Sequence, residues 1–238
     1  MLDAARYGAL SFDCYGTLID WEAGITNWAA DWQARGGQIK PRGFLQAFSG
    51  HERAVQAEQP SLRYPDVLAE VARRIAAAQG EPISDATAES FGASVGDWPA
   101  FPDSTEALRR LGERYKLIVL SNVDRTSFAR SQERLAVRFD AIITAEDVGS
   151  YKPATANFDT LRATVDGIGV PVHALLHVGE SLYHDIQPAN RDGLDVVWIN
   201  RAVERDSAPR ASGGVSEDAT PLATYPNMKA FADALLLA

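Results

Sequence analysis

Cysteine is almost absent from this chain. Cys14 is the one cysteine among 238 residues, so a disulfide framework or a cysteine-rich zinc site cannot form. So little cysteine is typical of a reducing compartment, and we expect a cytoplasmic location. The first residues lack the basic-then-apolar order of a signal peptide. No apolar run approaches the roughly 18 residues that a membrane span needs, so we expect no membrane partner.

Positive charge is also scarce. Lys and Arg total 23 against 32 Asp and Glu, which gives a formal net charge of −9. Proteins that neutralise many phosphates usually carry a basic face, and none is visible here, so nucleic acid is not an expected partner. Hydrophobic residues make up 46% and charged residues 23%. This composition is that of an ordinary globular protein and excludes a disordered or fibrous chain.

Short apolar runs predict the strands of a buried sheet. They are too short and too uniformly apolar for surface helices, and strands covered on both faces have this pattern. Helical patterns lie between them, which indicates an α/β fold with a doubly wound, parallel-sheet (Rossmann-like) core. The polar stretch 205–220 predicts a mobile surface loop. The apolar runs span residues 8–12, 116–120, 141–143, 174–178 and 195–199.

The segment 20–98 has a different pattern. Apolar residues such as Ile25 and Trp28 recur there at helical spacing, and no strand pattern is visible. We interpret this segment as a helical domain inserted after the first strand. The core would then consist of residues 1–19 and 99–238.

Polar residues follow several of the predicted strands. Ligands of an open parallel sheet bind beyond the carboxyl ends of its strands. We therefore expect acids, hydroxyl groups and a lysine to converge at one edge of the sheet. In chain order these residues are Asp13, Thr17, Ser121, Asn122, Lys152, Glu180 and Asp185.

These residues belong to four motifs, in a fixed order along the chain. The motifs are Phe12-Asp13-x-Tyr15-Gly16-Thr17-Leu18, Ser121-Asn122, Lys152-Pro153, and Gly179-Glu180-Ser181 with Asp185. The set resembles the motifs of the haloacid dehalogenase superfamily, and the helical segment resembles that family's cap domain. The resemblance covers the whole chain. It implies a hydrolase with a small anionic substrate, and a protein that can form a homodimer.

The resemblance implies a catalytic set. Asp13 would be the nucleophile, Thr17 would hydrogen-bond its carboxylate or a bound anion, and Lys152 would balance the charge beside Asp13. In a site without metal, Asp185 would help to activate water and Glu180 would pair with Lys152.

The resemblance also implies substrate-binding residues. Ser121 and Asn122 would present hydroxyl, amide and backbone donors to a phosphoryl group or a carboxylate, and Tyr15 and Leu18 would contact the substrate. The dehalogenase branch of the family has an arginine of the cap near the leaving halide. No arginine of this chain aligns cleanly with it, and the candidates are Arg42, Arg53 and Arg63.

Tyr15 distinguishes two functions. Family phosphatases carry an Asp two residues after the nucleophile, and this Asp protonates the alkoxide leaving group. Tyr15 stands there instead, as in the 2-haloacid dehalogenase (type II) branch, and a halide leaves without a proton. The resemblance therefore implies a hydrolytic dehalogenase of small 2-haloacids that needs no cofactor. Asp13 would displace halide and form an aspartyl ester, which water would hydrolyse to a 2-hydroxy acid.

Glu180 and Asp185 favour an alternative. Their spacing of five residues matches that of the acids in the family's metal-dependent phosphatases, and with Asp13 they would bind Mg²⁺, which prefers carboxylate oxygens. The alternative is a Mg²⁺-dependent phosphatase or phosphonate hydrolase of a small metabolite, acting through an aspartyl-phosphate. A binding protein that keeps the fold without turnover is a third interpretation.

Overall fold

The computed structural model describes residues 2–203 and 218–237. Its sheet has six parallel strands in the order β3-β2-β1-β4-β5-β6. The five predicted strands are confirmed to within one residue at each end, and β6 was missed because it is short and only partly buried. Most of the loop predicted at 205–220 lies outside the described residues. The strands are β1 Ala9–Phe12, β2 Lys116–Ser121, β3 Ala141–Thr144, β4 Leu175–Gly179, β5 Asp195–Ile199 and β6 Ala223–Tyr225.

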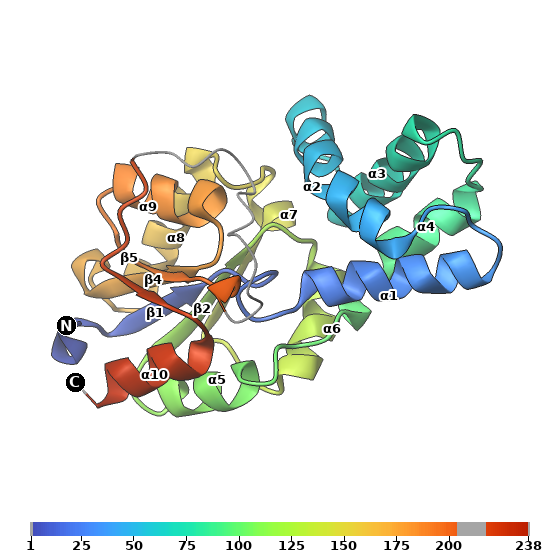
Figure 1. Ribbon diagram of the computed structural model, residues 1–238. Coiled ribbons are helices and arrows are strands. Elements are labelled where there is room, and N and C mark those ends of the chain that lie inside the picture. The colour runs from blue at the N-terminus through green and yellow to red at the C-terminus, as the bar shows by residue number, and fades with distance from the viewer. Residues whose placement is uncertain (1, 204–217, 238) are drawn as a thin grey trace.

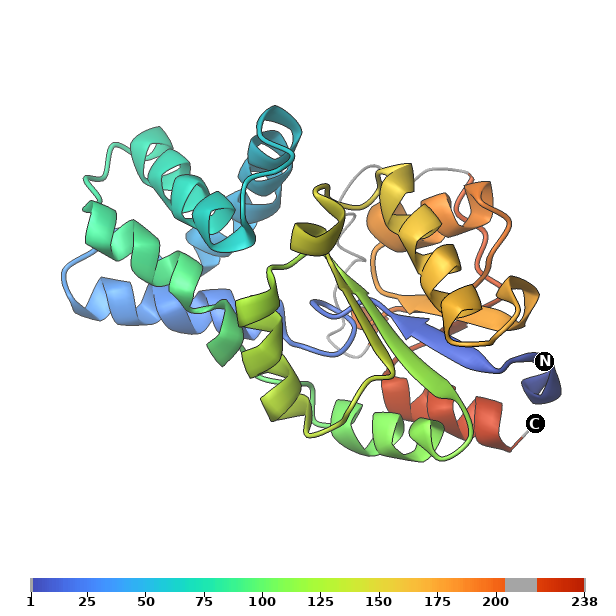
Figure 2. The ribbon, with the colours of Figure 1, turned by 180° about the vertical axis from the view of Figure 1, so that it is seen from behind.

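Helices cover both faces of this sheet, as the two opposite views show (Figures 1 and 2). Successive residues of a strand point to opposite faces. Leu10 therefore joins an apolar cluster with Leu108 and Phe231, whereas Ala9 joins a second cluster with Phe158. This arrangement confirms the doubly wound core. Its helices are α5 Ser104–Gly112, α6 Arg125–Leu135, α7 Ala145–Val148, α8 Thr155–Gly167, α9 Gln187–Arg191 and α10 Met228–Leu236.

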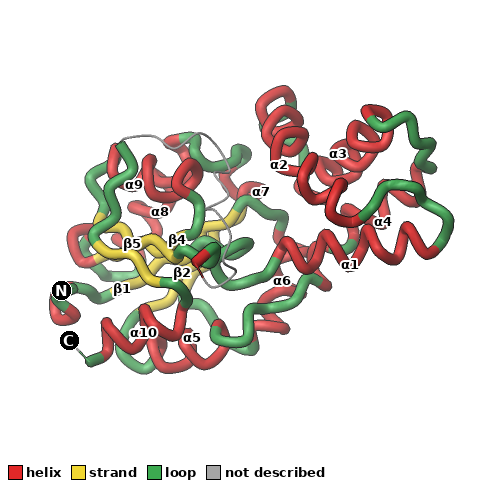
Figure 3. Tube along the Cα trace, in the orientation of Figure 1, coloured by secondary structure: helices red, strands yellow, loops and turns green. Residues whose placement is uncertain are grey.

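Between β1 and β2 the chain leaves the sheet for a helical insertion. Figure 3 shows it as helices joined by loops, and residues 20–98, all of which the structure describes, contain no strand. Its interior is aromatic: the Trp28 ring lies 4.6 Å from Phe91 and 5.3 Å from Phe44, centroid to centroid. The predicted helical insertion is confirmed. Its helices are α1 Trp21–Ala34, α2 Pro41–Glu58, α3 Tyr64–Ala78 and α4 Asp85–Ala93.

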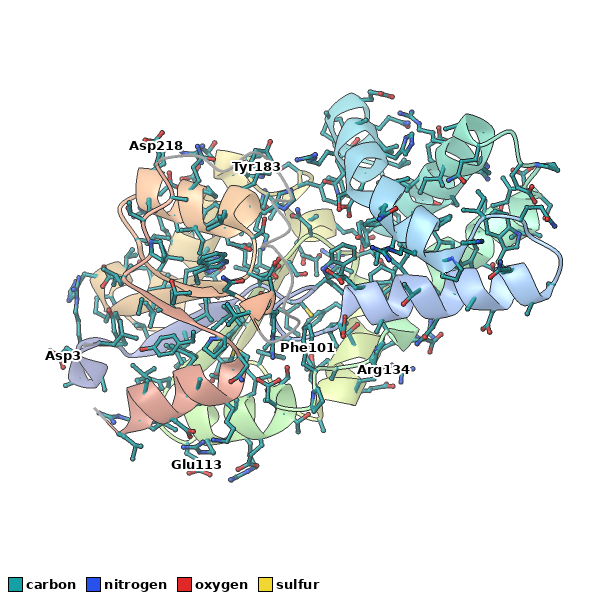
Figure 4. All side chains as sticks on the ribbon, in the orientation of Figure 1. Asp3, Phe101, Glu113, Arg134, Tyr183 and Asp218 are labelled. Atoms are coloured by element: carbon teal, nitrogen blue, oxygen red, sulfur yellow. The ribbon has the colours of Figure 1, made fainter. Side chains whose placement is uncertain are left out.

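The two connections between core and insertion run side by side. The backbone N–H of Asp20 donates to the Pro99 carbonyl at 2.8 Å, and that of Phe101 donates to the Leu18 carbonyl at 3.0 Å. Figure 4 labels Phe101 at this junction, between the sheet and α1. Because the paired connections mark where the chain leaves and re-enters the core, we propose 20–98 as the limits of the inserted domain.

None of the helices within residues 2–203 and 218–237 combines the length and the apolar character that a bilayer crossing requires.

Candidate active site

The strand order places a cavity beside the end of β1. Strand β1 lies between β2 on one side and β4 on the other, so the strand order reverses at β1. At such a topological switch point a parallel sheet has a crevice beyond the carboxyl ends of its strands. The crevice holds a small cavity of about 70 Å³ between the core and the insertion. Its lining residues are Asp13, Tyr15, Ser121, Asn122, Lys152, Glu180, Ser181, His184 and Asp185 from the core, and Trp21, Phe48, Ser49, Glu52, Gln56 and Tyr64 from the insertion.

Two carboxylates and one ammonium group form the floor of this cavity. Lys152 Nζ donates to Asp13 Oδ1 at 3.0 Å, to Asp185 Oδ1 at 2.6 Å and to the Leu120 carbonyl at 2.9 Å. The Lys152 side chain is 1% exposed, so all three of its N–H groups are used inside the protein. The expected pairing of Glu180 with Lys152 is therefore wrong, because the ammonium group has no donor left for it.

Burial and neighbouring charges shift the pKa values of Asp13, Asp185 and Lys152 in different directions. Burial raises the pKa of Asp13, the charge of Lys152 opposes this, and the charge of Asp185 raises the pKa further, so it lies above its usual range. Burial would also raise the pKa of Asp185, but the charge of Lys152 and a hydrogen bond from His177 hold it below its usual range. Burial would lower the pKa of Lys152, yet the two carboxylates raise it. Lys152 and Asp185 thus stay charged, and Asp13 is the more basic carboxylate.

The turn after Asp13 holds the carboxylate and approaches the insertion closely. Thr17 Oγ1 donates to Asp13 Oδ2 at 2.8 Å, the hydrogen bond expected of it. Gly16 has φ +105°, a conformation that favours glycine, and a Cβ there would lie in tight contact, 3.2 Å from Trp21 Nε1. Leu18 does not reach the cavity. Its side chain is fully buried in the apolar core, which corrects the expectation that it contacts substrate.

Tyr15 lines the cavity without offering a proton to it. Its hydroxyl shares a hydrogen bond with Ser131 Oγ at 2.8 Å. Burial raises the pKa of Tyr15 well above its usual range, so the hydroxyl keeps its proton. The position two residues after Asp13 therefore supplies no acid.

Ser121 and Asn122 differ in what they can offer a substrate. Ser121 Oγ is buried and has no hydrogen-bond partner among the described residues, so it is a donor available to an anion in the cavity. The Asn122 amide is engaged instead: Nδ2 donates to the Lys152 carbonyl at 3.1 Å, and Oδ1 accepts from the Lys152 N–H at 2.7 Å. The Asn122 side chain thus positions Lys152. Its Nδ2 carries a second N–H and Asn122 lines the cavity, so its contact with the substrate stays a prediction.

Asp185 is held from the core as well as from the cavity. His177 Nε2 lies 3.4 Å from Asp185 Oδ1, and His177 Nδ1 lies 2.8 Å from Ser11 Oγ on the neighbouring strand. The Ser181 N–H donates to Asp185 Oδ2 at 3.2 Å. These contacts fix the orientation of the Asp185 carboxylate.

The same contacts decide whether the acids fit Mg²⁺. Every oxygen of Asp13 and Asp185 accepts a hydrogen bond from Lys152, Thr17, His177 or Ser181. Within residues 2–203 and 218–237, no three His, Cys, Asp or Glu side chains are placed to hold a metal ion. Mg²⁺ needs near-ideal octahedral oxygen coordination, so the predicted metal set of Asp13, Glu180 and Asp185 does not fit it in this arrangement.

The sequence did not identify the polar residues that the insertion contributes. Ser49, Glu52 and Gln56 of α2 line the cavity. Their spacing of three and four residues puts them on one helical face, which is the one signal that the sequence contains. None of the arginine candidates Arg42, Arg53 and Arg63 is among the residues that line the cavity, although the charge of Arg53 acts on Glu52 and His184 of the lining.

Comparison with known proteins adds a family and a fold. The sequence model of the family described as haloacid dehalogenase-like hydrolase matches residues 7–191. The ribulose-1,5-bisphosphate 5-phosphatase of Halopiger xanaduensis is 29% identical over 119 residues, which is 49% of this chain and 48% of that protein. This chain therefore matches about half the length of that curated relative.

Two solved structures cover nearly the whole chain. The L-2-haloacid dehalogenase of Xanthobacter autotrophicus with covalently bound chloropropionic acid has a TM-score of 0.79 at 16% identity, over 97% of this chain and 98% of that one. The HAD-hydrolase YfnB of Bacillus subtilis bound to magnesium has a TM-score of 0.78 at 16% identity, over 97% and 99%. At these identities the likeness establishes a shared fold.

Proposed function

Because this chain belongs to the haloacid dehalogenase-like hydrolase family, we propose that it is a hydrolytic dehalogenase of small 2-haloacids. The position of Tyr15 carries the proposal. Its hydroxyl bonds Ser131 and keeps its proton, so the position two residues after Asp13 supplies no acid from the core to protonate an alkoxide. A halide is a weak base and leaves without a proton, so the core is suited to breaking a carbon–halogen bond.

In the first step Asp13 attacks the carbon that bears the halogen. An Asp13 oxygen forms the new C–O bond from behind, and the electron pair of the carbon–halogen bond leaves with the halide. The hydrogen bonds from Thr17 and Lys152 hold the carboxylate for this attack. Ser121 Oγ, which has no partner among the described residues, would donate to the substrate carboxylate. The product of this step is an aspartyl ester.

In the second step water attacks the Asp13 carbonyl carbon. The C–O bond to the carboxyl carbon breaks, the 2-hydroxy acid leaves with one proton of the water, and the other proton is released as Asp13 becomes a carboxylate again. Asp185 accepts three hydrogen bonds and has one acceptor position left. It would orient the water there, and its low pKa makes it a weak base. Lys152 would stabilise the negative charge that develops beside it.

One observation favours a Mg²⁺-dependent phosphatase as the second candidate. Glu180 lines the cavity together with Asp13 and Asp185, and the curated relative is a phosphatase. For this function Mg²⁺ would have to bind Asp13 and Asp185 next to the Lys152 ammonium group that both carboxylates already contact. The candidate predicts hydrolysis of aryl phosphates that a chelator abolishes.

Halide release from L-2-chloropropanoate tests the proposal. The purified protein is assayed in chelator without added metal, next to Asp13→Ala, and p-nitrophenyl phosphate is assayed with and without Mg²⁺. Halide release above the Asp13→Ala background supports the dehalogenase. Aryl phosphate hydrolysis that depends on Mg²⁺, without halide release from any 2-haloacid offered, would replace it with the phosphatase.

A further inference from the structure

The leaving group of this reaction faces the insertion. Attack from behind places the carbon–halogen bond on the side of the carbon away from Asp13. Asp13 lies on the floor, which the ends of the core strands build, and helices α1, α2 and α3 of the insertion contribute the other lining side chains. We call Ser49, Glu52, Gln56 and Tyr64 the insertion wall. The departing halide therefore meets the insertion wall.

Most of the charged side chains that line the cavity are acidic, and negative charge disfavours the binding of a halide. Asp13, Glu52, Glu180 and Asp185 all line the cavity, and Lys152 is the one cationic side chain among its described lining residues. An ionised Glu52 would repel both the anionic substrate and the departing halide. A neutral Glu52 would instead offer an O–H group as a hydrogen-bond donor.

The surroundings of Glu52 favour its neutral form. Glu52 is partly buried on α2, and the Tyr64 hydroxyl of α3 donates to its Oε1 at 2.7 Å. That bond occupies Oε1 and leaves Oε2 to carry a proton. Burial raises the pKa of Glu52 to about 7, although the hydrogen bond from Tyr64 and the charge of Arg53 both lower it.

We propose that Glu52 is a catalytic residue of the insertion, which in its protonated form donates a hydrogen bond from Oε2 to the departing halide. The inference rests on the proposed dehalogenase function. The electron pair of the broken bond stays on the halide, Glu52 keeps its proton, and no further reactant is needed. Glu52 thus takes the place that the resemblance assigns to an arginine of the cap.

The proposal has a consequence for pH dependence. A carboxyl group is neutral below its pKa, so turnover falls as the pH rises through the pKa of Glu52. One ionisation near pH 7 lowers the protonated fraction about 50-fold between pH 7 and pH 9.

Other titratable groups also face Glu52, and the comparison with Glu52→Gln separates their titration from that of Glu52. They are Tyr64 on α3, Arg53 on α2, Tyr151 before α8, and Asp13, Tyr15, Lys152, Glu180, His184 and Asp185 across the cavity. Burial lowers the pKa of His184 to about 4, so it is neutral throughout. The pKa values of Tyr64 and Lys152 lie above their usual ranges, so neither group titrates between pH 7 and pH 9.

The test compares Glu52→Gln with the wild type and with Glu58→Gln. Glutamine keeps a donor but cannot ionise, and Glu58 lies on the same helix in an ion pair with Arg74, outside the cavity. The kcat/KM of halide release is measured from pH 5.5 to pH 9.5, and thermal melts check that each variant folds.

We expect the wild type and Glu58→Gln to lose about 50-fold between pH 7 and pH 9, and Glu52→Gln to lose less than about threefold, from a lower starting rate. Wild-type loss that persists in Glu52→Gln, or no wild-type loss, overturns the role of Glu52 and leaves the dehalogenase proposal standing. No halide release by the wild type overturns the dehalogenase proposal and, with it, this inference.

Discussion

On the floor of the cavity Lys152 is 1% exposed and all its donors are used. On the insertion wall Glu52 is partly buried and held by one hydrogen bond from Tyr64. The charged groups of the floor are therefore paired and shielded from water, whereas Glu52 on the wall is less buried and has fewer hydrogen bonds. The reacting groups thus belong to the core, and the side chains contributed by the insertion are where relatives with the same fold can differ in substrate.

The largest expected effect is at the nucleophile. Asp13→Asn should lower halide release by roughly 10⁴-fold or more, because an amide cannot form the ester intermediate. Asp159→Asn, an exposed change on α8, is the matched control and should keep the wild-type rate. Intact-mass measurement confirms that the introduced asparagine has not hydrolysed back to aspartate. Wild-type release from Asp13→Asn protein of verified mass would remove Asp13 from the mechanism.

The second expected effect concerns the buried ion pairs of the floor, in which Lys152 pairs with two carboxylates. Lys152→Met leaves two buried carboxylates without their cation and should cost about 3–5 kcal/mol of unfolding free energy, measured in urea. Lys116→Met removes an exposed ion pair with Asp140 and should cost less than about 1 kcal/mol. Adding Asp185→Asn to Lys152→Met should recover part of the loss. Equal losses in the two single variants would contradict the contrast between buried and exposed pairs.

The third effect compares the addition of one methyl group, by a Gly→Ala substitution, in the core and in the insertion. A Cβ at Gly179 would lie 2.5 Å from the Asp185 Cβ, so Gly179→Ala should cost about 1–3 kcal/mol and lower kcat by displacing Asp185. A Cβ at Gly50 on α2 meets nothing within 4 Å, so Gly50→Ala should stabilise the protein by about 0.5–1 kcal/mol. Thermal or urea unfolding measures both. If Gly179→Ala is neutral, the floor tolerates the added methyl group, contrary to the close contact in the structure.

The smallest effect lies inside the insertion, away from the cavity. Trp28 Nε1 donates to Ser90 Oγ at 3.1 Å. Ser90→Ala should cost about 1 kcal/mol of unfolding free energy by leaving the indole N–H without this partner. The kcat of halide release should stay at the wild-type value because Ser90 does not line the cavity. A large drop in kcat would show that the packing of the insertion controls turnover.

Much of the fold and of the floor was predictable because the signals are local. A strand covered on both faces reads as a short apolar run, and parallel strands bring their carboxyl ends to one edge. Asp13, Lys152 and Asp185 follow strands, and the structure brings them together. The sequence did not predict β6 because it has only three residues, none of them buried, and carries no apolar run.

The other wrong or missing predictions arose because the sequence does not show in which direction a side chain points. Leu18 belongs to an expected motif, but packing buries its side chain in the apolar core. Helical spacing puts Glu52 and Gln56 on one face, yet it does not say whether that face meets the interior of the insertion, solvent or the cavity. That choice depends on how the inserted helices pack against the core.

The order of residues along the chain thus established the parallel core, the helical insertion and the polar groups at the strand ends, because each depends on neighbours within one element. Only the tertiary structure established which charged side chains contact one another. Lys152 and Asp13 are 139 residues apart in the chain, and Glu52 comes from a different part of the fold. The pKa values of Asp13, Asp185 and Glu52 depend on loss of water and on charges that distant segments bring near, and neither is encoded in any local pattern.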